Sequence, residues 1–193
     1  MVKNILVTVM VLFIFGCASN NSETMRYYSL TLSSNDDIAA QSEGKVRVVI
    51  DDVELPRFLK QDSMVIQLDK NEIYTANYNR WAEPLDVGIS KLMVTQLNAI
   101  DDNYAYERSA GEWNKGAIVH LRIEFSEFHA RVTGDVSVTG RLWVYDSDKS
   151  QIVDRSFRFV EPVVGDGYAA AVVSLRSGVL KLSNNIASMM PER

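Results

Sequence analysis

Alternating apolar and polar residues run through the first half of the chain, which is the pattern of β-strands with one buried face. The pattern predicts strands over residues 25–32 and 45–53, and the second strand ends before Pro56 because proline has no N–H for the next ladder bond. Residues 64–68 and 72–76 predict a hairpin around the turn-forming residues between them.

The second half of the chain predicts an antiparallel meander. Its strands are expected over residues 117–130, 132–145 and 152–160, and a polar turn joins the last two. Between Phe125 and Phe128 the apolar positions change phase, which indicates a β-bulge near Ser126 and Glu127. A short extended piece around Tyr104 and Tyr106 precedes the meander.

Two other stretches repeat apolar residues at spacings of three and four, which indicates amphipathic helices. One runs from about Pro84, a residue suited to a first turn, to Ala99, and the other follows Gly167 and reaches Met189. Each helix has one apolar face to bury, so a sheet must supply the opposing surface. The pattern predicts an α+β fold, a mostly antiparallel mixed sheet covered by two amphipathic helices, in a single domain over residues 25–193.

An uncharged apolar run ahead of these elements is too short to cross a bilayer core of about 30 Å as a helix. It has the form of a signal peptide, which we assign to residues 1–16. Its end, Ile14-Phe15-Gly16-Cys17, resembles a bacterial lipobox. In lipoproteins of that class the thiol is diacylated, the preceding peptide bond is cut and the new amine is acylated. The resemblance implies a covalent lipid such as palmitate on Cys17, and the alternative is an incidental cysteine behind an ordinary signal.

The residues after the cysteine bear on where the anchor lies. Residues 17–24 are mostly small and polar, and they predict a lipidated tether because they cannot bury apolar surface. Ala18 follows the cysteine, whereas an aspartate at that place favours retention in the inner membrane in the lipoprotein class. The resemblance therefore implies a lipid anchor in the outer membrane, on its periplasmic face.

Composition narrows the class of partner. The chain has 193 residues, a formal net charge of −5 and no block of Lys and Arg, so a nucleic acid would meet no basic footprint. Cys17 is the one cysteine, which leaves no pair for a disulfide and no cysteine metal cluster.

The candidate chemical residues predict neither a metal site nor an enzyme. His120 and His129 lie on one predicted strand at an odd separation, which directs them to opposite faces unless the bulge intervenes. The adjacent acids at 51–52 and 101–102 abut predicted turns and are expected to be solvated. The Asp146-Ser147-Asp148 run begins like a calcium loop but lacks the glycine and the distal glutamate. The chain has no nucleophile elbow, P-loop or dinucleotide-binding glycine pattern, so no cofactor beyond the lipid is expected.

Tryptophans are candidates for partner contacts, although most tryptophans fill cores. The chain has Trp81, Trp113 and Trp143, and the sequence leaves both roles open for them. Trp81 stands beside Arg80 at what the pattern predicts to be a helix entry.

Four motifs together resemble one family. They are Tyr27-Tyr28-Ser29-Leu30, Leu55-Pro56-Arg57-Phe58-Leu59, Arg80-Trp81-Ala82-Glu83-Pro84-Leu85 and Leu182-Ser183-Asn184-Asn185-Ile186-Ala187. This set is similar to the PqiC/YmbA family of ABC-type transport auxiliary lipoproteins. The sequence departs from the family at Lys60-Gln61, where an acidic residue and an arginine are expected.

The resemblance implies a non-catalytic docking subunit, anchored in the outer membrane, which works with an MCE-domain transport protein of the inner membrane in intermembrane lipid transport. A homo-oligomer is expected. The motif residues expected to meet the partner are Arg80, Trp81, Glu83, Leu55, Pro56 and Phe58.

Two other functions stay open at this point. An activator of a cell-wall synthase would also be an outer-membrane lipoprotein, but it would need a longer linker than residues 17–24 to cross the peptidoglycan. A periplasmic hydrolase would need a nucleophile and a base in a cleft, and it would lose activity when His120 or His129 is replaced.

Overall fold

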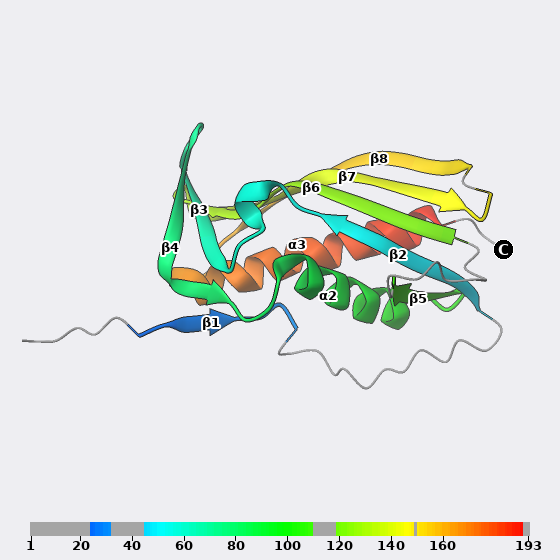
Figure 1. Cartoon of the computed structure of the whole chain (residues 1–193), viewed down its shortest axis with the longest axis horizontal. Helices are drawn as coiled ribbons and strands as arrows, with labels where there is room; N and C mark the ends of the chain where they lie inside the picture. Colours follow the sequence, from blue (N-terminus) through cyan, green and yellow to red (C-terminus); the bar gives the residue numbers. More distant parts are fainter. Residues whose placement is uncertain (1–23, 32–44, 110–118, 149, 191–193) are drawn as a thin grey trace, which may run out of the picture.

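The computed structural model describes residues 24–31, 45–109, 119–148 and 150–190 (Figure 1). The strands are β1 (Arg26–Tyr28), β2 (Val46–Glu54), β3 (Ser63–Asp69), β4 (Glu72–Trp81), β5 (Tyr104–Arg108), β6 (Val119–Arg131), β7 (Asp135–Asp146) and β8 (Gln151–Pro162). The helices are α2 (Leu85–Ile100), α3 (Gly167–Met189) and the short 3-10 helix η2 (Arg57–Leu59). Cys17 and Trp113 lie outside the described residues.

Strand β6 is the centre of the sheet. One of its edges pairs along its whole length with β7, which in turn pairs with β8, and this confirms the predicted antiparallel meander. The other edge is shared by two parallel partners, β2 over the first half of β6 and β3 over its last two residues. Farther from β6, β5 pairs with β2 on one side. On the other side β4 pairs with β3, and β1 pairs with β4 at the edge of the sheet. The expected mixed α+β sheet is confirmed, and it holds four parallel pairings beside the longer antiparallel ones.

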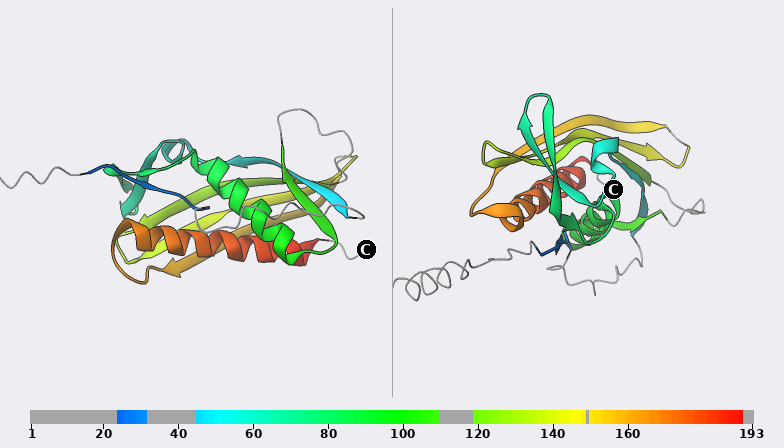
Figure 2. Two further views of the ribbon diagram at one scale, coloured as in Figure 1. Left: turned by 90° about the horizontal axis from the view of Figure 1, so that it is seen from below. Right: turned by 60° about the vertical axis from the view of Figure 1, so that its left-hand side comes forward.

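The predicted bulge in β6 decides which residues face the helices. The β6–β7 register shifts between Phe125 and Glu127, so the buried positions pass from Phe125 to Phe128. Both helices lie on the same side of the sheet (Figure 2). Their apolar stripes, which include Ile89, Met93, Leu97, Leu175, Val179, Leu182 and Ile186, are buried against it. The two predicted helices are thereby confirmed to within two residues at their ends.

Helix α3 approaches the sheet closely at one glycine. A Cβ added at Gly178 would stand 2.6 Å from Cγ2 of Val138 on β7, which is nearer than real side chains come. A glycine at this position lets the helix backbone lie directly on the strand, and the buried apolar area on both sides then stabilises the contact. Within the part of the chain that the structure describes, neither α2 nor α3 is both long and apolar enough to cross a bilayer.

The N-terminal segment departs from its predicted form. Its strand ends at Tyr28 and not at residue 32, and Leu30 leaves the sheet to enter the core, where it is 2% exposed. The carbonyl of Leu30 accepts a 2.5 Å hydrogen bond from Arg176 on α3, and the carbonyl of Tyr28 accepts one of 2.7 Å from the Ala82 amide. The segment is therefore held both by β4 and by the helices.

Strand β4 is longer than the sequence predicts. It continues to Trp81, so Arg80 and Trp81 end a strand and do not open a helix. The helix begins at Leu85, after a short connection through Glu83 and Pro84. The reason is tertiary, because β1 and β3 both pair with the last residues of β4 and keep them extended.

Candidate functional site

Three of the sequence motifs meet where β1, β4 and η2 come together. In the parallel register Tyr27 is opposite Arg80 and Tyr28 is opposite Trp81. The Trp81 amide donates a 2.6 Å hydrogen bond to the carbonyl of Asp62, which follows the η2 turn. The tyrosine motif, the tryptophan motif and the Leu-Pro turn thus form one joint, which we call the motif joint.

Two of the predicted partner residues fill the core beneath this joint. Trp81 is 7% exposed with its ring centroid 6.5 Å from that of Phe128, and Leu55 is 5% exposed. Their side chains therefore have a packing role. A direct contact of either one with a partner stays a prediction.

The other predicted partner residues reach the surface in part. Glu83 lies 2.5 Å from Lys91 Nζ, and Phe58 packs its ring 6.3 Å from that of His129. Pro56 is partly exposed. Arg80 is also partly exposed, but its Nε is buried and is the one such side-chain atom without a hydrogen-bond partner in the described ranges.

A hollow of about 630 Å³ lies beside the motif joint, between the end of β2 and the start of α2. Carboxylates from Glu54, Asp62 and Asp86 line it together with Lys60 and Gln61. Lys60-Gln61, the place where the sequence departs from the family pattern, thus lies on the wall of this hollow. Glu54 pairs with Arg122 at 2.7 Å, so Asp62 and Asp86 give the hollow its acidic character, which suits a basic segment of a partner better than an apolar one.

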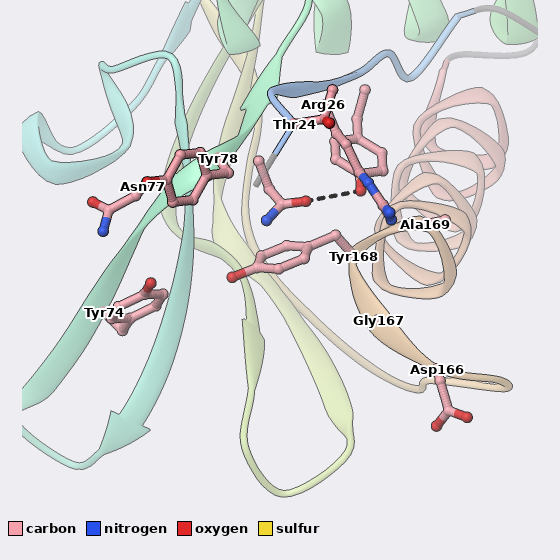
Figure 3. A pocket seen from close by; sticks show the side chains of 11 residues that line it. Thr24, Arg26, Tyr74, Asn77, Tyr78, Asp166, Gly167, Tyr168 and Ala169 are labelled. Atoms are coloured by element: carbon pink, nitrogen blue, oxygen red, sulfur yellow. Dashed lines mark hydrogen bonds between the residues drawn. The ribbon is translucent and has the colours of Figure 1, made fainter. Parts of the chain in front are cut away.

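A second hollow, of about 420 Å³, opens at the end of the domain where β1 begins (Figure 3). Four tyrosines from β1, β4 and α3 line it, namely Tyr28, Tyr74, Tyr78 and Tyr168. The Tyr28 hydroxyl donates to Asn79 Oδ1 at 2.9 Å, and burial raises the pKa of Tyr168, so that phenol stays neutral. The sequence analysis missed Tyr74 and Tyr78, although two tyrosines an even number of positions apart, one in the second predicted strand of the hairpin and one just after it, were the available signal.

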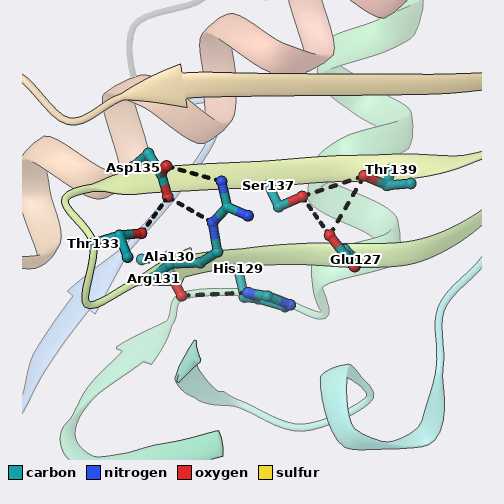
Figure 4. Close-up of polar contacts among 8 residues, drawn as sticks. All are labelled: Glu127, His129, Ala130, Arg131, Thr133, Asp135, Ser137 and Thr139. Atoms are coloured by element: carbon teal, nitrogen blue, oxygen red, sulfur yellow. Dashed lines mark hydrogen bonds and ion pairs between the residues drawn. The ribbon is translucent and has the colours of Figure 1, made fainter. Parts of the chain in front are cut away.

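A polar row runs along the face of β6 and β7 that points away from the helices (Figure 4). The Arg131 guanidinium donates two hydrogen bonds, of 2.6 and 2.8 Å, to the Asp135 carboxylate, and the Ser137 hydroxyl donates one to Glu127. The guanidinium of Arg131 lowers the pKa of Asp135 by hydrogen bonding. These groups satisfy one another, which gives the row a structural role.

The bulge brings the two histidines to the same face of β6, which is the exception that the sequence analysis allowed for. Nine residues of strand still separate them by about 30 Å. His120 contacts Asp51 at 3.0 Å, while His129 is 4% exposed under Phe58. No group of three or more potential metal ligands occurs within the described ranges.

The pH dependence of stability is expected to report on His129. Burial lowers its pKa below the ordinary 6.5, so the folded protein binds this proton less readily than the unfolded chain. The stability from neutral His129 is present above pH 6.5 and is lost as the pH falls through the folded-state pKa. Chemical denaturation between pH 7.5 and 5 checks this, because His129→Gln should show a shallower acid loss than the wild type. Equal slopes would contradict the assignment, and His120→Gln serves as the control.

One prediction about acidic residues is wrong. Asp101 is buried and not solvated: it accepts hydrogen bonds from the Tyr106 hydroxyl at 2.7 Å and from the Asn103 amide at 2.9 Å. Asp51 lies near the end of strand β2, within the predicted strand, and its side chain is 40% exposed. Asp146 does lie at a turn, where it accepts hydrogen bonds from the amides of Asp148 and Ser150.

Trp143 differs from Trp81 because it is only half-buried, on the open face of the sheet. The guanidinium carbons of Arg122 and Arg141 lie 5.8 and 5.4 Å from its ring centroid. Arg141 also holds Asp154 through two bonds of 2.6 Å.

Comparison with known proteins gives the family of the chain. Residues 28–187 match the model of a family described as the ABC-type transport auxiliary lipoprotein component. The intermembrane transport lipoprotein PqiC of Escherichia coli K12 is 28% identical over 166 residues, which are 86% of each chain.

Two solved structures share the fold. One, described as an uncharacterized protein, superposes with a TM-score of 0.73 at 24% identity, over 86% of this chain and 98% of its own. The other, from Xanthomonas campestris, gives a TM-score of 0.64 at 13% identity, over 86% of this chain and 90% of its own. Because the family match spans the domain from β1 to the last turns of α3, the chain belongs to the ABC-type transport auxiliary lipoprotein family.

Proposed function

We propose that this protein is the outer-membrane-anchored, non-catalytic docking subunit of an intermembrane lipid transport system with an MCE-domain protein in the inner membrane. The observation that carries the proposal is the family match over residues 28–187. The similarity to an intermembrane transport lipoprotein over 86% of the chain supports it further. In this scheme the acylated Cys17 holds the domain at the outer membrane, and the domain receives the partner.

The motif joint and the hollow beside it are the surface that we assign to the partner. Pro56, Phe58, Arg80 and Glu83 are partly exposed there, next to the carboxylates of Glu54, Asp62 and Asp86. A rigid turn beside an acidic hollow offers an apolar anchor point with a polar rim, which is how protein interfaces are commonly built. Formation of a homo-oligomer, also part of the proposal, would repeat this surface around a ring and let several copies engage one partner.

The proposal predicts that the MCE-domain protein copurifies with this lipoprotein. Reversing the charge of the hollow with Asp62→Lys and Asp86→Lys together should reduce capture at least tenfold, or about 1.4 kcal/mol. Both side chains are exposed, so the fold should survive. Ile152→Ser, at the far end of the domain, is the control that should capture normally. Recovery of the lipoprotein without any MCE-domain protein, from cells that express the whole system, would contradict the proposal.

A further inference from the structure

Exposed apolar side chains are concentrated at the end of the domain where β1 begins, which we call the β1 end. Within the described residues, twelve large hydrophobic side chains are exposed, and eight of them lie here. They are Met25, Tyr27, Leu68, Ile73, Tyr74, Tyr78, Val132 and Val164. The other four include Ile100, the last residue of α2, and Ile152, the second residue of β8. Figure 1 shows the end of α2 and the start of β8 at the end of the domain opposite to the start of β1.

These residues come from segments distant in sequence that the fold fixes together. The Val132 amide donates to the Gln67 carbonyl at 3.0 Å, which ties the β6–β7 turn to the β3–β4 hairpin. The Val163 amide donates to the Gly134 carbonyl at 2.9 Å, which ties the entry of α3 to the same turn. Tyr168 lines both the tyrosine hollow and a neighbouring hollow of about 290 Å³ that includes Val132. The β1 end is therefore one continuous, preformed surface.

The length of the chain between anchor and domain limits where this surface can lie. Thr24, which lines the tyrosine hollow, is the seventh residue after Cys17, so the two are at most about 25 Å apart when the chain between them is fully extended. Helix α3 starts at the β1 end and its 23 residues extend about 35 Å toward the other end. A lipid on Cys17 would thus hold the β1 end, and not the far end, next to the bilayer.

From this placement we propose that the β1 end rests on the outer membrane itself, with its tyrosines at the level of the lipid headgroups. The inference rests on the proposed acylation of Cys17. Tyrosine suits that depth because its ring is apolar and its hydroxyl stays hydrated, and Tyr74 and Tyr78 are each about two-fifths exposed. Leu68 and Ile73, near the tip of the hairpin, enter the acyl boundary, and the ammonium of Lys70 between them meets lipid phosphates.

Fluorescence quenching by brominated lipid tests this contact. The protein is purified from membranes and reconstituted in phosphatidylethanolamine and phosphatidylglycerol vesicles, and Tyr74→Trp is compared with Ile152→Trp after subtraction of wild-type emission. The Trp introduced at position 74 is expected to lose about half of its emission in brominated vesicles, because an interfacial aromatic ring lies beside the acyl chains. The Trp at position 152 should be unchanged. Tyr78→Trp gives a second reporter if the first variant folds poorly.

Each outcome decides one point. Protein that floats with the vesicles but shows equal, weak quenching at positions 74 and 152 overturns membrane contact and leaves the anchor intact. Protein that does not float overturns the anchor, and with it the proposed function. Quenching at position 74 that disappears as the protein is crowded on the vesicle would assign the surface to a second copy of the chain and overturn the lipid contact.

Discussion

Cys17→Ser is expected to move the protein from the membrane fraction to the soluble periplasmic fraction almost completely. The lipid can attach at one thiol only, because Cys17 is the sole cysteine. Each buried methylene contributes about 0.8 kcal/mol, so several acyl chains together bind far more tightly than the β1 end could alone. The fold should persist, since the first buried core residue in the described ranges is Leu30, well after the cysteine. Cell fractionation measures the first effect, and thermal unfolding of the released protein measures the second.

Ser19→Ala is the matched control for this substitution, because it changes the same polar segment and leaves the thiol in place. It should stay in the membrane fraction. A Cys17→Ser protein that resists extraction by alkaline carbonate would refute acylation as the anchor. A released protein that still supports lipid transport fully would show that anchoring is incidental to the function.

Trp81→Ala is expected to lower the free energy of unfolding by about 3–5 kcal/mol, the usual cost of emptying a large aromatic site in a core. Its ring packs against Phe128 below the motif joint, and the substitution removes these contacts along with buried apolar area. Denaturation in urea measures the change as a shift of the midpoint at constant slope. Trp143→Ala is the control and should cost much less, because Trp143 is only partly buried and does not belong to the core.

A second substitution at the same position, Trp81→Phe, separates packing from recognition at the motif joint. Trp81→Phe keeps an aromatic ring in the core and should recover most of the stability. If Trp81 acts only through packing, this variant also captures the partner normally. A stability loss below about 1 kcal/mol for Trp81→Ala would mean that the ring is not a core residue, and its predicted role as a partner contact would regain support.

The sequence predicts those parts of the fold that depend on local periodicity. The apolar stripes of α2 and α3 repeat at helical spacing, so the sequence locates both helices. The apolar positions change phase between Phe125 and Phe128, and this locates the bulge because a shift of one residue in register would otherwise turn the buried side chains to the other face of the sheet. The parallel pairings could not be predicted from local patterns of this kind. Nothing near β2 or β3 in the sequence shows that both pair with the same edge of β6, since that choice is made by the long connections between them.

Side-chain surroundings are the other part that sequence could not supply. The sequence places Asp101 at a turn, where an acidic side chain is expected to be solvated. In the structure the Tyr106 hydroxyl, five residues later, donates a hydrogen bond to its carboxylate, and this bond offsets the cost of burying it. The sequence around Trp81 does not show whether its ring faces solvent or packs against Phe128. Of the candidate site, the motifs were identifiable from the sequence, whereas the acidic hollow and the β1 end arise only when distant segments meet.

The attachment of β1 also determines how the domain withstands mechanical load. Tension between a lipid anchor and a partner would reach the domain at the N-terminal end of β1, directed along the strand. The hydrogen bonds of β1 to β4 would then be strained together in shear and would not be opened one at a time. Behind them Leu30 is seated in the core, and Arg176 holds its carbonyl. A pull from the membrane must break the strand pairing and withdraw a buried side chain at once, which makes this short strand the mechanical clamp of the domain.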